Sequence, residues 1–299
     1  MRVQAWGIGT IRVTHFTDPS CPFAYAASPA LAVLDWRYRE QLEWRVVTIG
    51  LSEDPQRYID AGYTPARVTV GSLAAFRRHG MPFLFEPRAR IAASSRACRA
   101  IVAARLLDPD REQDVQRALQ LGWFTTTLLL DEDEDIAVAL ARVDGLDVAE
   151  IVSAIDEEAT LAAYEQDKRE TRSAEGSPTD FQGKARQTDG PVRYSAPSLV
   201  FEDAAGNRLE AGGFQPVEAY DVLIANLDPT LHREPPPETP APLLERFREG
   251  LTTQEVAALL ARGNDAPERI SAEAALIELI AVGQAVREPL GDDALWKPT

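Results

Sequence analysis

The order of extended and helical patterns near the N-terminus constrains the fold more than any other feature of this chain. Residues 10–16 (TIRVTHF) are short and rich in β-branched and aromatic side chains, which predicts a strand. A helical pattern begins at Pro22, and its apolar positions share one face: Ala27, Leu31, Leu34 and Tyr38. Pro29 should kink or restart that helix, because its ring removes a backbone hydrogen bond. Residues 42–51 then form a near-continuous apolar run, which predicts a strand buried on both faces.

The middle of the chain has a different character. Residues 53–172 are dominated by Ala, Leu, Arg and Glu in helical patterns, which predicts a helical insertion. Residues 196–213 contain two extended runs around a Gly-Asn turn, which predicts a hairpin, and residues 215–227 predict a helix. Strand, helix and strand, followed by an insertion, a hairpin and a helix, indicate an α/β fold.

The C-terminal part begins with a proline-rich stretch. Five prolines within residues 233–242 predict an extended, semi-rigid linker. Two helices (251–261 and 271–283) and a hairpin (285–298) should follow, which suggests a small separate unit with a winged-helix-like shape. Residues 243–299 hold six Lys or Arg and ten Asp or Glu, a net charge of 6 − 10 = −4. This charge argues against a helix that reads the major groove of DNA. We therefore expect this unit to act as a lid or to contact a protein, for example in a homodimer.

Charge and hydropathy exclude several classes of function. The net charge of −16 argues against a nucleic-acid binder and against binding to anionic membrane surfaces. The sequence has no apolar run long enough to span a bilayer, and its N-terminus does not resemble a secretory signal. Two cysteines do not make a disulfide framework, so a cytoplasmic location with reduced thiols is expected.

Cys21 is the strongest candidate for chemistry. It follows the predicted strand and the turn TDPS, and Pro22 after it suits the first position of a helix. Unpaired backbone N–H groups and the helix dipole stabilise negative charge at such a position. We therefore expect the pKa of Cys21 to lie below the value of about 8.5 of a free thiol, which would make it a nucleophile. The alternative is a buried structural thiol.

The segment DPSCPF, placed between a strand and a kinked helix, resembles the active site of the DsbA-like branch of the thioredoxin superfamily. The helical insertion fits that branch, and YSAPSLVF (residues 194–201) resembles its cis-proline loop. The resemblance implies that Pro197 carries a cis bond beside Cys21 and that Ala196, with Pro22 and Phe23, contacts substrate. The resemblance covers roughly residues 13–227 and does not include the linker or the C-terminal part. Together with the patterns described above, it gives the expected division of the chain: a thioredoxin-like domain over residues 1–232, the linker 233–242 and the winged-helix-like domain 243–299.

One position departs from the family pattern. Family oxidoreductases carry Cys-x-x-Cys, whereas here the fourth position is Ala24. We expect a thiol–disulfide oxidoreductase or isomerase in which Cys21 acts alone on a protein or small-molecule disulfide. No permanently bound cofactor is expected, and a low-molecular-weight thiol would serve as co-substrate.

Two other hypotheses remain open. The 2-hydroxychromene-2-carboxylate isomerases and kappa-type glutathione transferases belong to the same branch. They suggest a thiol-cofactor-dependent isomerase or transferase acting on a small aromatic or electrophilic compound. The missing second cysteine also fits a catalytically degenerate scaffold that binds a partner.

Other reactive residues have structural interpretations. Cys98 shares a helical stripe with Val102 and Leu106, which predicts a buried core thiol. Alternatively, it resolves mixed disulfides, if the insertion brings it over Cys21. His15 could lie near the site or pack in the sheet. The acidic run 131–135 lacks the glycine and the final glutamate of a calcium loop, so we expect it to begin a helix, and we expect no metal site.

Overall fold

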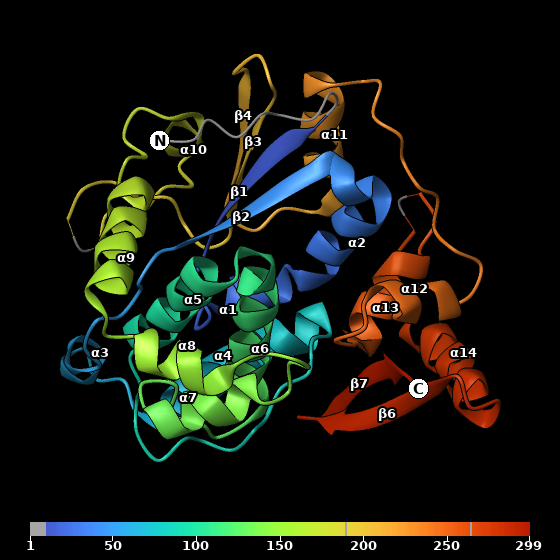
Figure 1. Ribbon diagram of the computed structural model, residues 1–299, viewed down its shortest axis with the longest axis horizontal. Coiled ribbons are helices and arrows are strands. Elements are labelled where there is room, and N and C mark those ends of the chain that lie inside the picture. The colour runs from blue at the N-terminus through green and yellow to red at the C-terminus, as the bar shows by residue number, and fades with distance from the viewer. Residues whose placement is uncertain (1–9, 189, 264) are drawn as a thin grey trace.

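The structure is a computed structural model that describes residues 10–188, 190–263 and 265–299. The N-terminal segment in which the sequence predicts no secretory signal lies outside these residues. In Figure 1 the main sheet occupies the upper part of the molecule, the green helices of the insertion lie below it, and the orange and red C-terminal part lies at the right. In the described part of the chain, no helix is both long and apolar enough to span a membrane.

Four strands form the main sheet and confirm the α/β fold. They are β1 (Ile11–Thr17), β2 (Leu42–Thr48), β3 (Ser198–Glu202) and β4 (Arg208–Gly212), in the order β2-β1-β3-β4. β1 pairs in parallel with β2 and antiparallel with β3, and β3 and β4 form the predicted antiparallel hairpin. Parallel pairing of β1 and β2 requires a crossover, which the helices α1 (Pro22–Ala26) and α2 (Ser28–Tyr38) provide.

The two faces of the sheet are covered differently, because alternate strand residues point to opposite sides. On one face, Ile11 and Val13 of β1 pack with residues of α2 and of α11 (Val217–Leu227). On the other face, Phe16 packs with Val47 and with Tyr194, whose ring stacks on Phe16 at 4.2 Å. Both β1 and β3 are therefore buried.

Residues 53–172 are mainly helical, as predicted. The helices are α3 (Gln56–Asp60), α4 (Pro65–His79), α5 (Ser95–Leu107), α6 (Glu112–Thr125), α7 (Asp133–Leu140), α8 (Val148–Ala154) and α9 (Glu158–Thr171). The short helix α10 (Pro178–Phe181) follows them, and 3₁₀ turns occupy Arg39–Gln41 and Pro109–Arg111. The apolar side chains of α4 to α8 form one large core that also includes Tyr25 and Val46, so the insertion packs directly on the active-site helix and the sheet.

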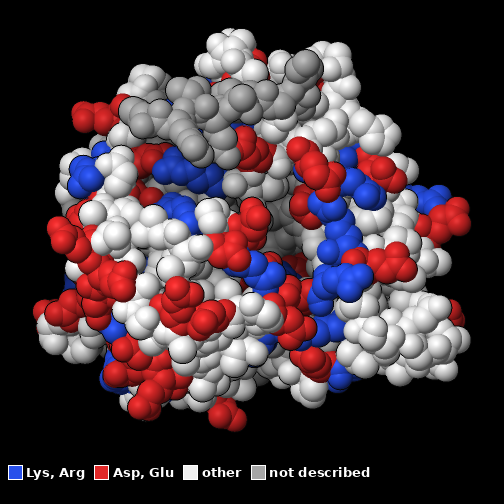
Figure 2. All heavy atoms as spheres, viewed as in Figure 1, with Lys and Arg blue, Asp and Glu red and all other residues white. Residues whose placement is uncertain are grey.

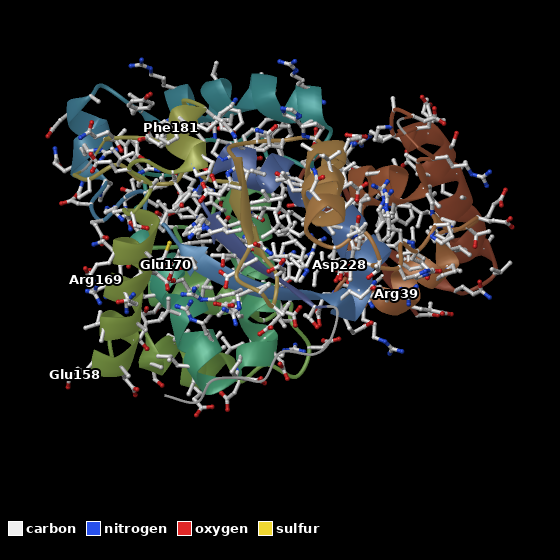
Figure 3. The ribbon with its side chains drawn as sticks, turned by 90° about the horizontal axis from the view of Figure 1, so that it is seen from above. Arg39, Glu158, Arg169, Glu170, Phe181 and Asp228 are labelled. Atoms are coloured by element: carbon white, nitrogen blue, oxygen red, sulfur yellow. The ribbon has the colours of Figure 1, made fainter. Side chains whose placement is uncertain are left out.

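Side chains of the insertion form hydrogen bonds with the backbone of β2, which is an edge strand of the main sheet. The Val46 N–H donates to Glu112 at 3.1 Å, and the Thr48 N–H donates to Asp167 at 2.9 Å. Arg105 donates to the Val46 carbonyl and to Asp167. Glu170 of α9, labelled in Figure 3, pairs with Arg45 at 2.7 Å. An unpaired strand edge is a template for aggregation, and these bonds occupy it.

The C-terminal part contains the two helices and the hairpin that the sequence predicted. The helices are α13 (Thr253–Leu260) and α14 (Arg269–Ala281), and the hairpin is β6 (Ala285–Leu290) with β7 (Asp293–Pro298). The helix α12 (Ala241–Arg246) and the short strand β5 (Leu251–Thr252) were not predicted. The strands form a second sheet in the order β5-β7-β6. Thr252 and Glu255 make a capping box at the start of α13. The winged-helix-like shape and the domain boundaries stay predictions.

The C-terminal part is packed firmly against the rest of the chain, whereas the sequence predicted a small separate unit. Val33 and Trp36 of α2 belong to the same apolar cluster as residues of α12, α13 and α14. The Trp36 indole N–H donates to the carbonyl of Pro235 at 2.8 Å, which fixes the proline-rich stretch to α2. Arg117 of α6 pairs with the fully buried Glu255 at 2.6 Å. This part therefore buries both apolar and charged surface of the thioredoxin-like region.

Candidate active site

Cys21 lies where β1 gives way to the first helix. The chain leaves β1 at Thr17 and turns through residues 18–20, and the Cys21 N–H donates to the Asp18 carbonyl at 3.0 Å. Cys21 is the N-cap residue of α1, and Pro22 takes the first helical position, as predicted. The helix is interrupted at Ala27 and restarts as α2, just before Pro29, so the predicted restart is confirmed.

The fold brings residues 194–201 to Cys21. The peptide bond between Ala196 and Pro197 is cis, as the sequence predicted. The Cys21 thiol donates to the carbonyl oxygen of Ala196 at 3.3 Å, across 175 positions of sequence. The Ser198 hydroxyl donates to the Ser195 carbonyl at 2.6 Å and accepts the Gly213 N–H, which holds the loop against β4. A sulfur atom therefore lies beside a cis-proline loop.

The protonation state of Cys21 differs from the prediction. Burial raises the pKa of Cys21 to about 11, although the backbone N–H groups of Ala24 and Phe23 lower it. The charge of Asp18 raises it further. The helix N-terminus acts in the expected direction, but the side chain is only 6% exposed, and removal from water disfavours the thiolate more strongly. The prediction of a lowered pKa was wrong, because burial arises from tertiary packing that the local sequence does not show.

Asp18 is a structural centre of the site that sequence reasoning missed. It is fully buried, and one carboxylate oxygen accepts from the Ser20 N–H at 2.9 Å and the Ser20 hydroxyl at 2.6 Å. The other oxygen accepts from the Leu51 N–H at 2.8 Å and from the Ser94 hydroxyl at 3.0 Å. Asp18 thus ties the Cys21 turn to the end of β2 and the start of α5. The Asp-x-Ser spacing, which is typical of a local side-chain turn, was the available signal.

Cys98 is the buried core thiol that the sequence predicted. It is inaccessible to solvent, packs with Val102 and Tyr164, and donates to Asp18 at 3.5 Å. Burial and the Asp18 carboxylate raise the pKa of Cys98 well above its ordinary value. Leu106 does not continue the buried stripe, since it is 50% exposed. Both thiols are free, so Cys21 and Cys98 are not joined by a disulfide.

The other predicted site residues surround Cys21 in different environments. The resolving position is occupied by Ala24, which has no sulfur and is buried in α1. Phe23 is 51% exposed and presents an apolar ring at the start of the helix. Pro22 and Ser20, on either side of Cys21, line a cavity of about 370 Å³ between the turn and the insertion. Cys21 is therefore next to both an exposed aromatic residue and a substantial cavity.

His15 packs in the sheet, on the side of a second cavity. It is buried, burial lowers its pKa to about 4, and its Nε2 atom has no hydrogen-bond partner among the described residues. With Trp44 and Gln116 it lines a cavity of about 530 Å³, which arginines of the insertion and the C-terminal part also border. Figure 2 shows a hollow between these two parts with basic side chains gathered beside it.

The acidic run 131–135 begins a helix, as predicted. Asp133 and Asp135 lie in the first turn of α7, and the Asp133 carboxylate pairs with Arg96 at 2.5 Å. Asp131 pairs with Arg90 at 2.6 Å. Within the described ranges, no group of three His, Cys, Asp or Glu side chains is placed to hold a metal ion.

The site agrees with the similarities of the chain to known proteins. The DSBA-like thioredoxin domain family matches residues 12–194, more than half of the chain. Among curated proteins no match was found. A protein from Nitrosomonas europaea, assigned as a disulfide isomerase, is similar in structure, with a TM-score of 0.54 and 15% identity over 74% of this chain and 97% of that one.

Two further solved structures share the fold. The cytosolic disulfide reductase DsbM from Pseudomonas aeruginosa has a TM-score of 0.52 and 18% identity, covering 72% of this chain and 98% of its own. A protein from Streptomyces coelicolor, assigned as a DsbA oxidoreductase, has a TM-score of 0.52 and 18% identity, covering 74% and 91% respectively. The family match, together with the strand–cysteine–helix geometry, leads to one conclusion: the chain belongs to the DSBA-like thioredoxin domain family.

Proposed function

We propose that this protein catalyses thiol–disulfide exchange with Cys21 as its single nucleophile and an external low-molecular-weight thiol as the second reactant. The observation that carries the proposal is the contact of the Cys21 sulfur with the Ala196 carbonyl, 3.3 Å away and directly before the cis bond to Pro197. This contact joins a helix N-terminus, which stabilises a developing thiolate, to backbone groups that can align an extended substrate.

The exchange takes place in two steps. The Cys21 thiolate attacks one sulfur of a substrate disulfide, so a mixed disulfide forms, the other sulfur leaves as a thiolate, and the Cys21 proton passes to solvent. Because Ala24 carries no thiol, an external thiolate then attacks the substrate sulfur of the mixed disulfide. That attack releases Cys21 as a thiolate and leaves the external thiol joined to the substrate.

Four residues would bind substrate in this proposal. Pro22 and Phe23 form the rim of the helix start, and the exposed Phe23 ring offers an apolar contact. Ala196 and Pro197 would present the cis-proline loop to the substrate. DsbM, which shares the fold, has a solved structure with GSH, and this supports a small thiol as the second reactant here.

The test is steady-state reduction of a small disulfide by glutathione, with wild-type protein, Cys21→Ser and Cys98→Ala. We expect Cys21→Ser to lose turnover and Cys98→Ala to keep it, because the Cys98 thiol is inaccessible to solvent. Full turnover in Cys21→Ser would overturn the proposal.

A second candidate has specific support from the raised pKa of Cys21 and the adjoining cavity. In a thiol-cofactor-dependent isomerase or transferase, the cofactor supplies the reacting sulfur and Cys21 can stay protonated. Isomerisation or conjugation of an electrophilic aromatic compound that needs glutathione and survives Cys21→Ser would favour this candidate. Absence of both activities, with a partner that co-purifies, would favour the binding scaffold.

A further inference from the structure

The cavity beside Cys21 has an aromatic wall. Its lining includes the aromatic residues Tyr58, Tyr63, Phe83, Trp123 and Phe124, together with residues of α4. Figure 3, seen from above, shows α4 at one edge of the molecule. A volume of about 370 Å³ lies within the range of small-molecule sites and accommodates a substituted aromatic ring. The cavity is therefore suited in size and polarity to an aromatic ligand.

Arg88 brings a positive charge into this apolar cavity. Its guanidinium lies 5.1 Å from the centre of the Trp123 ring, and its Nε–H donates to the Leu128 carbonyl at 2.9 Å. These contacts fix the side chain. Its two terminal nitrogens form no hydrogen bond or ion pair with any residue in 10–188, 190–263 or 265–299. Burial lowers the pKa of Arg88 to about 10, and the charge of Asp131 opposes this shift.

The other charged residues of the cavity are already satisfied. Arg90 is bound by Asp131 and Glu132, and Arg67 donates to the Gly62 carbonyl at 3.0 Å and lies over Tyr63. Glu86 is exposed. The charge of Asp131 acts on the half-buried Arg88, but the Asp131 carboxylate is bonded to Arg90. The terminal nitrogens of Arg88 can therefore still bind the carboxylate of a ligand. This cationic cavity also contrasts with the chain as a whole, whose net charge is −16.

We propose that Arg88 and Trp123 form a specificity site for the carboxylate end of a small aromatic thiol or disulfide that reacts at Cys21. Arg88 would bind the carboxylate and the aromatic wall would bind the ring. Ser20 and Pro22, the neighbours of Cys21 in the chain, line the same cavity, so a ligand in the cavity lies against the turn that carries Cys21. The inference rests on the proposed function, because it concerns the substrate of that reaction.

Two aromatic disulfides test this site. Dithiobis(nitrobenzoate) carries a carboxylate on each ring, whereas dipyridyl disulfide is neutral. In both reactions the Cys21 thiolate attacks one sulfur, an aryl mixed disulfide forms and an aryl thiol leaves, and its absorbance reports the rate. The measured quantity is the ratio of the two second-order rate constants, from which the reactivity of Cys21 itself cancels.

We expect Arg88→Met to lower this ratio by about tenfold or more, the effect of losing one charge-assisted contact. Arg88→Lys keeps a cation and should retain part of the preference, and it guards against a folding defect in Arg88→Met. The matched control is Arg67→Met, which removes an arginine of the same cavity that is already bonded. A ratio unchanged in Arg88→Met, with its melting temperature intact, would overturn the inference.

Binding without reaction separates the inference from the proposed function. Nitrobenzoate, which has no sulfur, is titrated calorimetrically into Cys21→Ala and into Cys21→Ala/Arg88→Met. Binding to the first variant and loss in the second would support the anion site even if Cys21 proved unreactive. Reactive Cys21 with no nitrobenzoate binding and no change in the rate ratio would refute the anion site and leave the proposed function standing.

Discussion

The raised pKa of Cys21 makes a quantitative prediction about its reactivity. At pH 8 a free thiol with a pKa of about 8.5 is roughly one quarter thiolate, whereas a pKa of about 11 leaves about one part in a thousand, some 240-fold less. A more basic thiolate is intrinsically more nucleophilic. With a Brønsted coefficient of about 0.45, a pKa higher by about 2.5 units raises the rate constant of the thiolate roughly thirteen-fold. The net expectation is a rate about twenty-fold below that of a free cysteine, before any steric effect of burial.

The assay is alkylation of Cys21 by iodoacetamide at a series of pH values, in the Cys98→Ala background so that one thiol remains. Modification is followed by intact mass. Below the pKa, each pH unit should raise the rate tenfold, and the rise should continue to about pH 10. Steric hindrance would lower every rate without altering this slope. A plateau below pH 9 would refute the reasoning, because it would mean that the helix N-terminus outweighs burial.

Three further predictions concern other parts of the molecule. Ala24→Cys supplies the absent resolving thiol, so oxidation with oxidised glutathione should give an internal disulfide with Cys21, seen as a loss of two hydrogens in intact mass. A glutathione adduct that persists on Cys21 in this variant would contradict this. Burial raises the pKa of Glu112 to about 7, so the folded state holds that proton more tightly than the unfolded state does. The stabilising contribution of protonated Glu112 is complete below the ordinary pKa of a glutamate and is lost as the pH rises through about 7. Wild type should therefore lose up to about 3 kcal/mol relative to Glu112→Gln between pH 4 and pH 8 in denaturant unfolding, and parallel pH profiles would exclude the effect. Arg117→Met leaves the buried Glu255 without its ion partner and should lower the free energy of unfolding by about 3–5 kcal/mol; a loss below about 1 kcal/mol would show that the pair does not anchor the C-terminal part.

The prediction for Arg117→Met has two control variants. Arg248→Met removes an exposed arginine near the same C-terminal surface and should leave the free energy of unfolding almost unchanged. The double variant Arg117→Met/Glu255→Gln should recover part of the loss, because neither side chain then carries a buried charge.

Local patterns predicted the secondary structure around the site. The β-branched run of β1, Pro22 at the helix start and the Gly-Asn turn between β3 and β4 each depend on neighbouring residues alone, and each is present in the structure. The place of the cis bond before Pro197 came from the resemblance to the DsbA-like branch. The contact between the Ala196 carbonyl and the Cys21 thiol joins segments far apart in sequence, and no local pattern encodes it.

Three features that depend on contacts between distant segments were not predictable. The pKa of Cys21 is set by packing that removes water from its sulfur, and this reversed an expectation based on the helix dipole. Trp36 lies on the side of α2 that packs on the C-terminal part, a contact that the proline-rich stretch alone did not indicate. Arg88 lies in an irregular segment without periodicity, so its place over Trp123 became visible only in the folded chain.

The central claim is that Cys21 reacts alone and that an external thiol completes the cycle. It is tested most directly by intact mass after incubation with oxidised glutathione, for wild type, Cys21→Ala and Cys98→Ala. We predict one glutathione adduct on wild type and on Cys98→Ala, none on Cys21→Ala, and full release of the adduct by added glutathione. An adduct on Cys21→Ala, or an internal disulfide between Cys21 and Cys98, would contradict the claim.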